Sequence, residues 1–374
     1  MNVLSVSGNL SNSLYGRLFS ELLNSHNVNT LAFDPFQGKT YEFSKANTEI
    51  FAPRPSKAFK KSYFDKLFPM NISRGIAFAY ADYVCNVDLM HAHTLSYDAE
   101  ICHEIFKKTA KPFCVTIRNT DINYVLRYKY HLRSHYSKII LNSRRILFPN
   151  ACYRDRFIEY FCPSVKRHVI ANSCFVPNSI DPLFFCNGRY SAHLTSSSTS
   201  IHIVHVSNCS SNKNLVRALK ALALIPSHTK IKISIVGLRS EKISKFVNTQ
   251  FSRFDPVIYP YLPQKRLVDL YLTADILLNP SIHETFGLVY FEALSQGLSI
   301  IYSRREGVDD MVQSPFAFSC NPKSIPSIAS ALMQAIEMRP AASTNYPQLK
   351  ELLLSLYSPK AAALKLHSVY SQLV

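Results

Sequence analysis

The sequence predicts an α/β protein with two doubly wound domains. Short apolar strands alternate with helical patterns over the first half of the chain, and the alternation begins again at Ile201. Strands that alternate with helices favour a parallel sheet whose two faces are covered by helices. The chain has 374 residues, which is enough for two such domains at about 100–200 residues each.

The first domain is predicted over residues 1–182. It opens with a β-α-β pattern, in which a strand at 3–7 is followed by leucines at helical spacing from Leu14 to Leu23 and by a strand at 28–33. The same alternation predicts a helix at 100–108 and strands at 88–92, 113–117, 146–148 and 167–170.

A polar stretch separates the two domains. Seven of the ten residues from Ser191 to Ser200 are Ser or Thr, which indicates a flexible joint, and the linker is predicted over 183–200. The second domain is predicted over 201–357. Its pattern predicts helices at 215–224, 264–272 and 288–295, and strands at 201–206, 231–236, 257–259, 276–278 and 298–302. Ser358 and Pro359 suit the N-cap and first position of a last helix.

The composition indicates a globular protein with an anionic partner. Lys and Arg number 42 against 25 Asp and Glu, and the net charge of +17 suits phosphate, nucleic acid or a membrane surface. Nine cysteines without a Cys-x-x-Cys pair favour a reduced, cytoplasmic compartment over disulfides or a zinc site. No apolar run is long enough for a transmembrane helix, and the first residues are too polar for a signal peptide, so we expect neither.

The most informative segment, 279–294, follows a predicted strand and runs into a helix. Glu284 precedes this helix, and Glu292 lies inside it, about 7 Å further along the axis. Between them are first-turn N–H donors, which together with the helix dipole favour an anion: those of Phe286, Gly287 and Leu288. Because carboxylates accept from hydroxyl groups, the order indicates a ligand with two phosphates between a sugar and a ribose. The alternative is a helix-capping Glu284 and a solvated Glu292.

This segment resembles the signature of a known family. The Glu-x7-Glu block from Glu284 to Glu292, with Phe-Gly-Leu after the first glutamate, looks like that of the retaining family-4 (group 1) glycosyltransferases. Residues 176–181, Val-Pro-Asn-Ser-Ile-Asp, are similar to the family's interdomain Pro-Asn-Gly-x-Asp stretch, with Ser179 in place of Gly. The resemblance implies the GT-B architecture, in which two Rossmann-like domains face a central cleft and a C-terminal helix crosses back to the first domain.

The resemblance also implies roles for the residues of the segment. Glu292 would hold the ribose hydroxyls of a nucleotide, and Glu284 would hold the hydroxyls of the donor sugar at the catalytic centre. The amides of Phe286, Gly287 and Leu288 would contact the sugar or the diphosphate. No cofactor or metal is expected, because the Asp-x-Asp motif typical of metal-dependent relatives is not found. The protein itself would then stabilise the charge on the leaving diphosphate.

Basic residues that would bind this diphosphate are expected in loops that follow strands. In the loop 206–214, which includes Ser207 and Asn208, Lys213 matches the family's catalytic Lys, and Ser210 stands where an Arg is usual. Replacement cations would be Arg239, which follows Gly237, or Arg304 and Arg305. The alternatives are a solvated Lys213 and a charged surface turn at 304–310. The backbone near Tyr261 and Leu262 resembles the part of the fold that meets the base.

The first domain contributes a second set of candidate residues. Alternation along the strand 88–92 puts His91 and His93 on one face, and His93 matches a family His that meets the donor sugar. Arg118 and Asp121, after the strand 113–117, resemble an acceptor-binding segment of the family. The alternatives are a core histidine at His93 and a structural pair between Arg118 and Asp121.

The basic charge of the first domain suggests a membrane surface. Residues 107–167 hold 14 basic and 3 acidic side chains, and the segment 51–68 mixes bases with aromatics. Both would suit an anionic bilayer at the inner face of a membrane, and the alternative is a solvated surface. We find no module that favours nucleic acid.

These observations together predict a retaining hexosyltransferase type of enzyme that works without a metal. It would move a sugar from a nucleoside diphosphate donor to a glycan or a lipid-linked acceptor, as in the biosynthesis of a surface polysaccharide such as lipopolysaccharide. The alternatives are a GT-B epimerase of sugar nucleotides and a non-catalytic binding relative.

Overall fold

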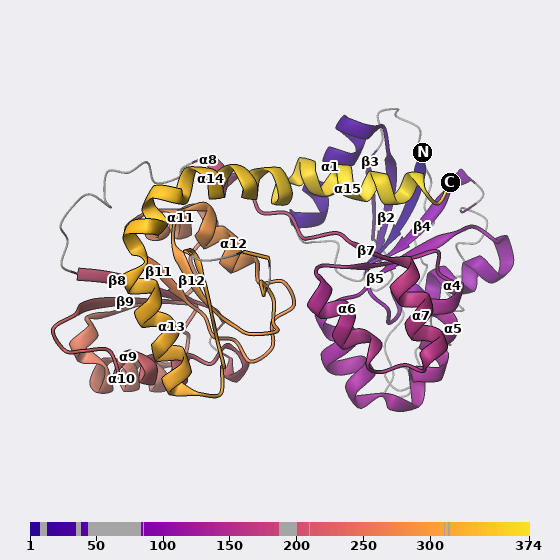
Figure 1. The fold of residues 1–374 in the computed structure, drawn as a ribbon. Helices are drawn as coiled ribbons and strands as arrows, with labels where there is room; N and C mark the ends of the chain where they lie inside the picture. Colours follow the sequence, from indigo (N-terminus) through magenta and orange to yellow (C-terminus); the bar gives the residue numbers. More distant parts are fainter. Residues whose placement is uncertain are drawn as a thin grey trace. The chain divides into compact units, whose positions relative to one another are not determined.

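The chain forms two α/β units, each built around its own sheet (Figure 1). The computed structural model describes residues 1–7, 13–34, 39–43, 84, 86–186, 200–208, 210–309, 311–312 and 315–374. The first unit comprises Met1–Ser179 and Pro359–Val374, and the second comprises Ile180–Ser358.

The first unit is built on a seven-stranded sheet in the order β3-β2-β1-β4-β5-β6-β7. Its neighbouring strands are parallel, except that β3 runs antiparallel to β2. The strands are β1 (Asn2–Val6), β2 (Asn29–Asp34), β3 (Lys39–Phe43), β4 (Leu89–Ala92), β5 (Phe113–Thr116), β6 (Arg145–Phe148) and β7 (Ser173–Phe175).

Helices cover both faces of this sheet because successive strand residues point to opposite sides. Leu4 of β1 joins a core with residues of four helices, and Val3 joins the core on the other face with two helices. The four are α4 (Asp98–Thr109), α5 (Arg133–Asn142), α6 (Ala151–Ile158) and α7 (Pro163–Asn172), and the two are α1 (Ser13–His26) and α15 (Pro359–Ser371). Between β5 and α5 lie the π-helical turn η2 (Asp121–Leu126) and the 3₁₀ turn η3 (Tyr130–Leu132).

The last helix, α15, packs in the first unit, which confirms that the C-terminal helix crosses back to it. Leu366 and Tyr370 of α15 are buried against Phe19 and Leu22 of α1. The Tyr370 hydroxyl lies 2.6 Å from Nδ1 of His91, whose Nε2 lies 2.7 Å from Oγ1 of Thr116. Burial lowers the pKa of His91 to about 3, aided by Arg118, so the ring is neutral in this chain of hydrogen bonds.

The second unit has a six-stranded sheet in the order β10-β9-β8-β11-β12-β13, in which every pair is parallel. The strands are β8 (Ser200–Val206), β9 (Lys230–Val236), β10 (Pro256–Tyr259), β11 (Ile276–Leu278), β12 (Ser299–Ser303) and β13 (Ala317–Cys320). The sheet packs between α9 (Leu215–Leu222), α10 (Glu241–Gln250) and α13 (Ile325–Glu337) on one face, and α8 (Leu183–Cys186), α11 (Gln264–Thr273), α12 (Leu288–Ser295) and α14 (Arg339–Tyr357) on the other. Short 3₁₀ turns are η4 (Ser211–Lys213) and η5 (Ser252–Phe254).

Two sequence-based predictions about elements are wrong. The strand predicted at 167–170 lies inside α7, whose buried Val165 and Val169 are spaced four residues apart, as on one helix face. The predicted linker at 183–200 begins instead with α8, because Phe184 is buried in the core of the second unit. The chain passes between the units at Ser179 and Ile180, before the predicted boundary at 182. The central cleft stays a prediction, and residues 51–68 and 187–199 lie outside the described residues.

No helix in the described part of the chain has the length and apolar character needed to cross a membrane.

The docking of α15 yields a testable prediction. Tyr370→Phe removes the hydroxyl partner of His91 in a buried site, so the free energy of unfolding should fall by about 1–3 kcal/mol. Tyr357→Phe is the matched control, because the Tyr357 hydroxyl makes no hydrogen bond with the described residues. Urea unfolding followed by circular dichroism measures both, and equal stability of the two variants would show that docking does not need this hydrogen bond.

Candidate functional site

The candidate site of the second unit lies at the carboxyl ends of its parallel strands. Parallel pairing brings the loops after β8, β9, β11 and β12 to the same edge of the sheet, where ligands of doubly wound sheets bind. These loops carry most of the candidate residues that the sequence predicted in this unit. Leu288 and Glu292 lie on α12, and Tyr261 and Leu262 follow β10.

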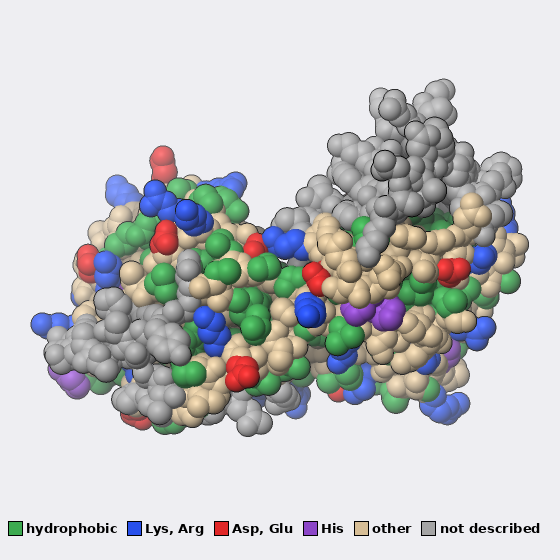
Figure 2. Space-filling model, turned by 90° about the horizontal axis from the view of Figure 1, so that it is seen from above, with side chains coloured by type: hydrophobic (Ala, Val, Ile, Leu, Met, Phe, Trp, Pro, Cys, Tyr) green, Lys and Arg blue, Asp and Glu red, His purple; other side chains and the backbone are tan. Residues whose placement is uncertain are grey.

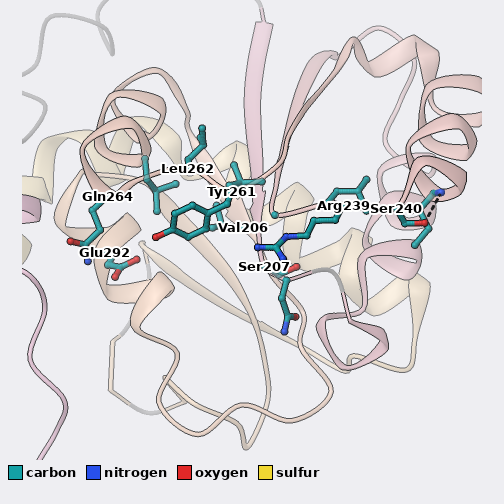
Figure 3. A pocket seen from close by; sticks show the side chains of 14 residues that line it. Val206, Ser207, Arg239, Ser240, Tyr261, Leu262, Gln264 and Glu292 are labelled. Carbon is teal, nitrogen blue, oxygen red and sulfur yellow. Dashed lines mark hydrogen bonds between the residues drawn. The ribbon is translucent and has the colours of Figure 1, made fainter. Parts of the chain in front are cut away.

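A pocket of about 600 Å³ opens at this edge. It brings together five residues that the sequence predicted for nucleotide binding, which are Ser207, Asn208, Gly237, Arg239 and Glu292. Tyr261 and Leu262 also line it. In Figure 3, Glu292 and Arg239 lie towards opposite ends of the pocket, with Tyr261 between them. The pocket therefore offers an acceptor at one end, a cation at the other and an aromatic ring between.

Glu292 is the fifth residue of α12 and is largely buried. Its carboxyl makes no hydrogen bond with the described residues. Burial, aided by the negative charge of Asp181, raises its pKa to about 7. A carboxyl that is buried without a partner is costly to ionise, and the cost falls when hydroxyl groups of a ligand donate to it.

A buried histidine sets the polarity of the pocket wall at Ser207. Nδ1 of His205 lies 2.7 Å from the Leu278 carbonyl, which only accepts, so Nδ1 carries the proton. Burial lowers the pKa of His205 to about 4, so the ring is neutral at neutral pH and Nε2 is an acceptor. The Ser207 hydroxyl, 3.0 Å from Nε2, therefore donates to His205.

Gly237 allows two strand-end loops to approach each other closely. Its φ is +92°, and a Cβ at this position would lie 1.9 Å from the Ser207 carbonyl oxygen. A side chain at residue 237 would therefore force apart the loops after β8 and β9, which form this wall of the pocket. This steric constraint explains why residue 237 is a glycine.

A second group of predicted residues meets where the chain enters α12. Nζ of Lys213 lies 2.6 Å from Oε2 of Glu284, with 23% of the lysine side chain and 14% of the glutamate side chain exposed. The sequence predicted both residues, and the structure pairs them directly. The pair holds a cation and a carboxylate at one end of the candidate site.

Other side chains hold this ion pair in position. Asn212 exchanges two hydrogen bonds with the backbone of His283, of 2.8 and 3.0 Å, and so ties the turn of Lys213 to the loop of Glu284. The Glu306 carboxylate accepts from the Glu284 N–H at 2.8 Å. Neither residue is predicted from the sequence. Glu306 lies in the strand-end loop of Arg304 and Arg305, whereas no sequence signal points to Asn212.

The start of α12 leaves backbone donors available. Gly287 is the N-cap, with φ +74°, and the amides of Phe286, Gly287 and Leu288 have no hydrogen-bond partner in the described part of the chain. Phe286 fixes the turn, because its ring is buried and stacks on Phe291 at 4.5 Å between centroids. The expected donor cluster is therefore present beside Glu284, whose Cγ lies within 3.1 Å of where a Gly287 Cβ would sit.

The three replacement cations differ in their positions. Arg239 lines the 600 Å³ pocket. Arg304 lines a different cavity of about 410 Å³ beside β13 and α13. Arg305 is exposed in its turn. Ser210 is also exposed, and its N–H lies 3.3 Å from Oδ1 of Asn208, which lines the pocket.

The candidates in the first unit are more enclosed. His93 is 1% exposed, and its Nε2 lies 2.6 Å from Oγ of Ser5. Its ring centroid is 4.0 Å from that of His91, so the two histidines do share a face. Nδ1 of His93 and Nε of Arg118 have no partner within the described residues, and both side chains line a cavity of about 30 Å³, enough for one water. The catalytic assignment of His93 stays a prediction.

Arg118 and Asp121 are not a side-chain ion pair. The Arg118 guanidinium donates to Oδ1 of Asn178 at 2.8 Å and to the Tyr15 hydroxyl at 3.3 Å. Asp121 is fully buried and accepts from the N–H groups of Arg118 and Ser96 at 2.8 and 3.3 Å. Burial raises its pKa to about 6 in spite of these bonds. The acceptor-binding role of Arg118 and Asp121 stays a prediction.

No group of three or more His, Cys, Asp or Glu that would hold a metal ion occurs in the described ranges.

Comparison with known proteins shows a family match over part of the chain and a shared fold over all of it. Residues 189–348 match the model of the glycosyl transferases group 1 family. No curated protein gave a match. Among solved structures, sucrose-phosphate synthase from Thermosynechococcus elongatus has 16% identity and a TM-score of 0.73, and it covers 100% of this chain and 99% of its own.

Two other structures show the same similarity of fold. A glycosyltransferase from Rickettsia africae has 15% identity and a TM-score of 0.72, covering 100% of this chain and 98% of its own. HepE from Anabaena, solved in complex with UDP, has 12% identity and a TM-score of 0.67, covering 100% of both chains. The chain has the GT-B fold, and its residues 189–348 match the model of the glycosyl transferases group 1 family.

Proposed function

We propose that this protein is a retaining glycosyltransferase that uses a nucleoside diphosphate sugar as donor. The observation that carries the proposal is the 600 Å³ pocket, in which a buried carboxyl without a protein partner lies in one cavity with Arg239. The acceptor is a glycan or a lipid-linked glycan, and the proposed setting is the cytoplasmic assembly of a surface polysaccharide.

Each part of the donor has a partner of matching chemistry. Glu292 accepts from the ribose hydroxyls. Tyr261 and Leu262 lie beside the base. Arg239 and the amides at the start of α12 face the diphosphate, because cations and N–H donors stabilise its negative charge.

The Lys213–Glu284 pair serves the sugar end of the donor. Glu284 accepts from the sugar hydroxyls, and Lys213 stabilises the charge that develops on the diphosphate as it leaves. The bond between the anomeric carbon and the phosphate oxygen breaks, and a bond from that carbon to the acceptor oxygen forms on the same face. The proton of the acceptor hydroxyl passes to the leaving diphosphate.

Several solved structures of the same fold support a donor of this class. HepE was solved with UDP and glucose, and a trehalose-6-phosphate enzyme from E. coli was solved with UDP-2-fluoro glucose. A study of trehalose-6-phosphate synthase concerns glycosyl transfer with retention. Those proteins are 13–14% identical to this chain, and their ligands make UDP sugars the first donors to test.

The pKa of Glu292 predicts how donor binding depends on pH. We expect the affinity for the best-binding nucleotide sugar to rise between about pH 6 and pH 8, because the ionised carboxylate accepts both ribose hydroxyls. Glu292→Gln should lose this pH dependence and bind about tenfold more weakly at pH 8. Isothermal titration with UDP, GDP and ADP sugars measures the affinities. Glu351→Gln, an exposed change on α14, is the control.

The same variant also tests the pKa through protein stability. A carboxyl whose folded pKa is raised stabilises the protein when protonated, and this contribution is lost as pH rises from about 4.5 through 7. At pH 8, Glu292→Gln should therefore be more stable than the wild type by about 2 kcal/mol. A wild type with pH-independent affinity and no stabilisation by the variant would contradict the role given to Glu292.

The ion pair predicts a loss of transfer that exceeds the loss of donor binding. Glu284→Ala and Lys213→Ala should each lower the rate of transfer by about a hundredfold or more, while donor affinity changes by less than about tenfold. Glu351→Ala and Lys220→Ala, both exposed, are matched controls. Product formation with membrane extracts as acceptor measures transfer. Donor conversion without any acceptor would instead identify an epimerase and overturn the proposal.

A further inference from the structure

An exposed aromatic and basic surface lies in the first unit, outside the donor site. We define the tyrosine patch as Tyr124, Arg127, Tyr128, Lys129 and Tyr130. The three tyrosines are 58%, 61% and 71% exposed. Rings of this size are rarely left so exposed in a cluster unless the surface has a partner.

The fold imposes this exposure. Ile122, Val125 and Leu126 turn inward from η2 and are buried, so the residues between them face outward. Asp121 anchors the start of η2 by accepting from backbone N–H groups, and Arg133 closes its end by donating from Nε to the Leu126 carbonyl at 2.9 Å. Tyr124 therefore stands on a turn whose apolar residues are already used by the core. Tyr128 follows η2, and Tyr130 begins η3, whose Leu132 is buried.

Basic side chains of the tyrosine patch lie close to its aromatic rings. The Arg127 guanidinium is 5.5 Å from the centroid of the Tyr128 ring, and Nζ of Lys129 is 6.0 Å from that of Tyr124. Arg156 adjoins the patch through its hydrogen bond to Asn123, at 3.0 Å. Basic side chains are also spread over both units on the face in Figure 2.

The surrounding sequence carries no opposing charge. Residues 122–154 contain seven Lys or Arg and no Asp or Glu. The first acid beyond them, Asp155, is paired with Arg154 at 2.7 Å. A continuous positive segment with exposed tyrosines complements a surface that is anionic and has an apolar layer beneath its charges.

We propose that the tyrosine patch docks the protein on an anionic lipid bilayer. The tyrosine rings lie at the level of the headgroups, where amphipathic aromatic side chains are enriched, and Arg127 and Lys129 contact the lipid phosphates. The inference rests on the proposed function only in its biological purpose: docking would bring the enzyme to lipid-linked acceptors. Docking itself requires no donor.

Co-sedimentation of the full chain with vesicles tests the proposal. The protein should sediment with vesicles of equal parts phosphatidylglycerol and phosphatidylcholine, remain free with phosphatidylcholine alone, and be released by salt. Arg127→Glu/Lys129→Glu should weaken binding by at least about 30-fold, since each cation near such a surface contributes about fivefold. Tyr124→Ala/Tyr128→Ala/Tyr130→Ala should weaken binding without any change of charge.

A matched control separates the patch from net charge. Lys220→Glu/Lys323→Glu makes the same change of charge on exposed residues of the second unit and should bind vesicles nearly as the wild type does. Thermal shift with the best nucleotide sugar checks that the patch variants remain folded and keep the donor site. If the protein bound no nucleotide sugar, vesicle binding would still be expected. The docking proposal and the proposed function can therefore be disproved independently.

Three results of the vesicle assay would each overturn docking by the patch. They are the absence of sedimentation at low salt, equal weakening by the control pair, and unchanged binding of the triple tyrosine variant. Preference for a soluble polyanion such as single-stranded RNA over the vesicles would also overturn the proposal, because it would assign the same charge to nucleic acid.

Discussion

Parallel strand pairing in the second unit brings four loops, far apart in the sequence, to one edge of the sheet. Everything in the candidate site depends on that constraint. Lys213 and Glu284 are 71 residues apart, yet their charged atoms lie 2.6 Å from each other because β8 and β11 are neighbours. Gly237 then permits the close approach of the loops after β8 and β9. Without these backbone contacts, the charged side chains would be separate surface residues.

Burial determines the protonation states of His205 and Glu292 more than neighbouring charges do. His205 and Glu292 both shift towards their neutral forms because water is excluded around them. A neutral His205 accepts from the hydroxyl of Ser207, which lines the pocket. Arg239 then supplies charge at the other end of the pocket. One wall is therefore suited to the hydroxyl groups of a nucleoside and another part to its phosphates.

Much of this site was predictable from the sequence, because its residues follow strands in a regular alternation. Glu292 and the donors at the start of α12 could be placed from strand-helix order and from one glycine. The pairing of Lys213 with Glu284 was not predictable, since it depends on Asn212 and Glu306, which act through loop backbone. The error at 167–170 has a similar origin, because a short apolar run is compatible with either a strand or a helix. Only packing decides between them.

The position of α15 has a consequence for how the chain is made. The face of the first sheet that carries Phe19 and Leu22 is completed by Leu366 and Tyr370. A ribosome must therefore synthesise almost the whole chain before that apolar face is covered. The second unit, which is continuous from Ile180 to Ser358, has all of its strands available earlier. During synthesis, we expect it to be the first to reach its native structure, while one face of the amino-terminal sheet is still covered by α1 alone.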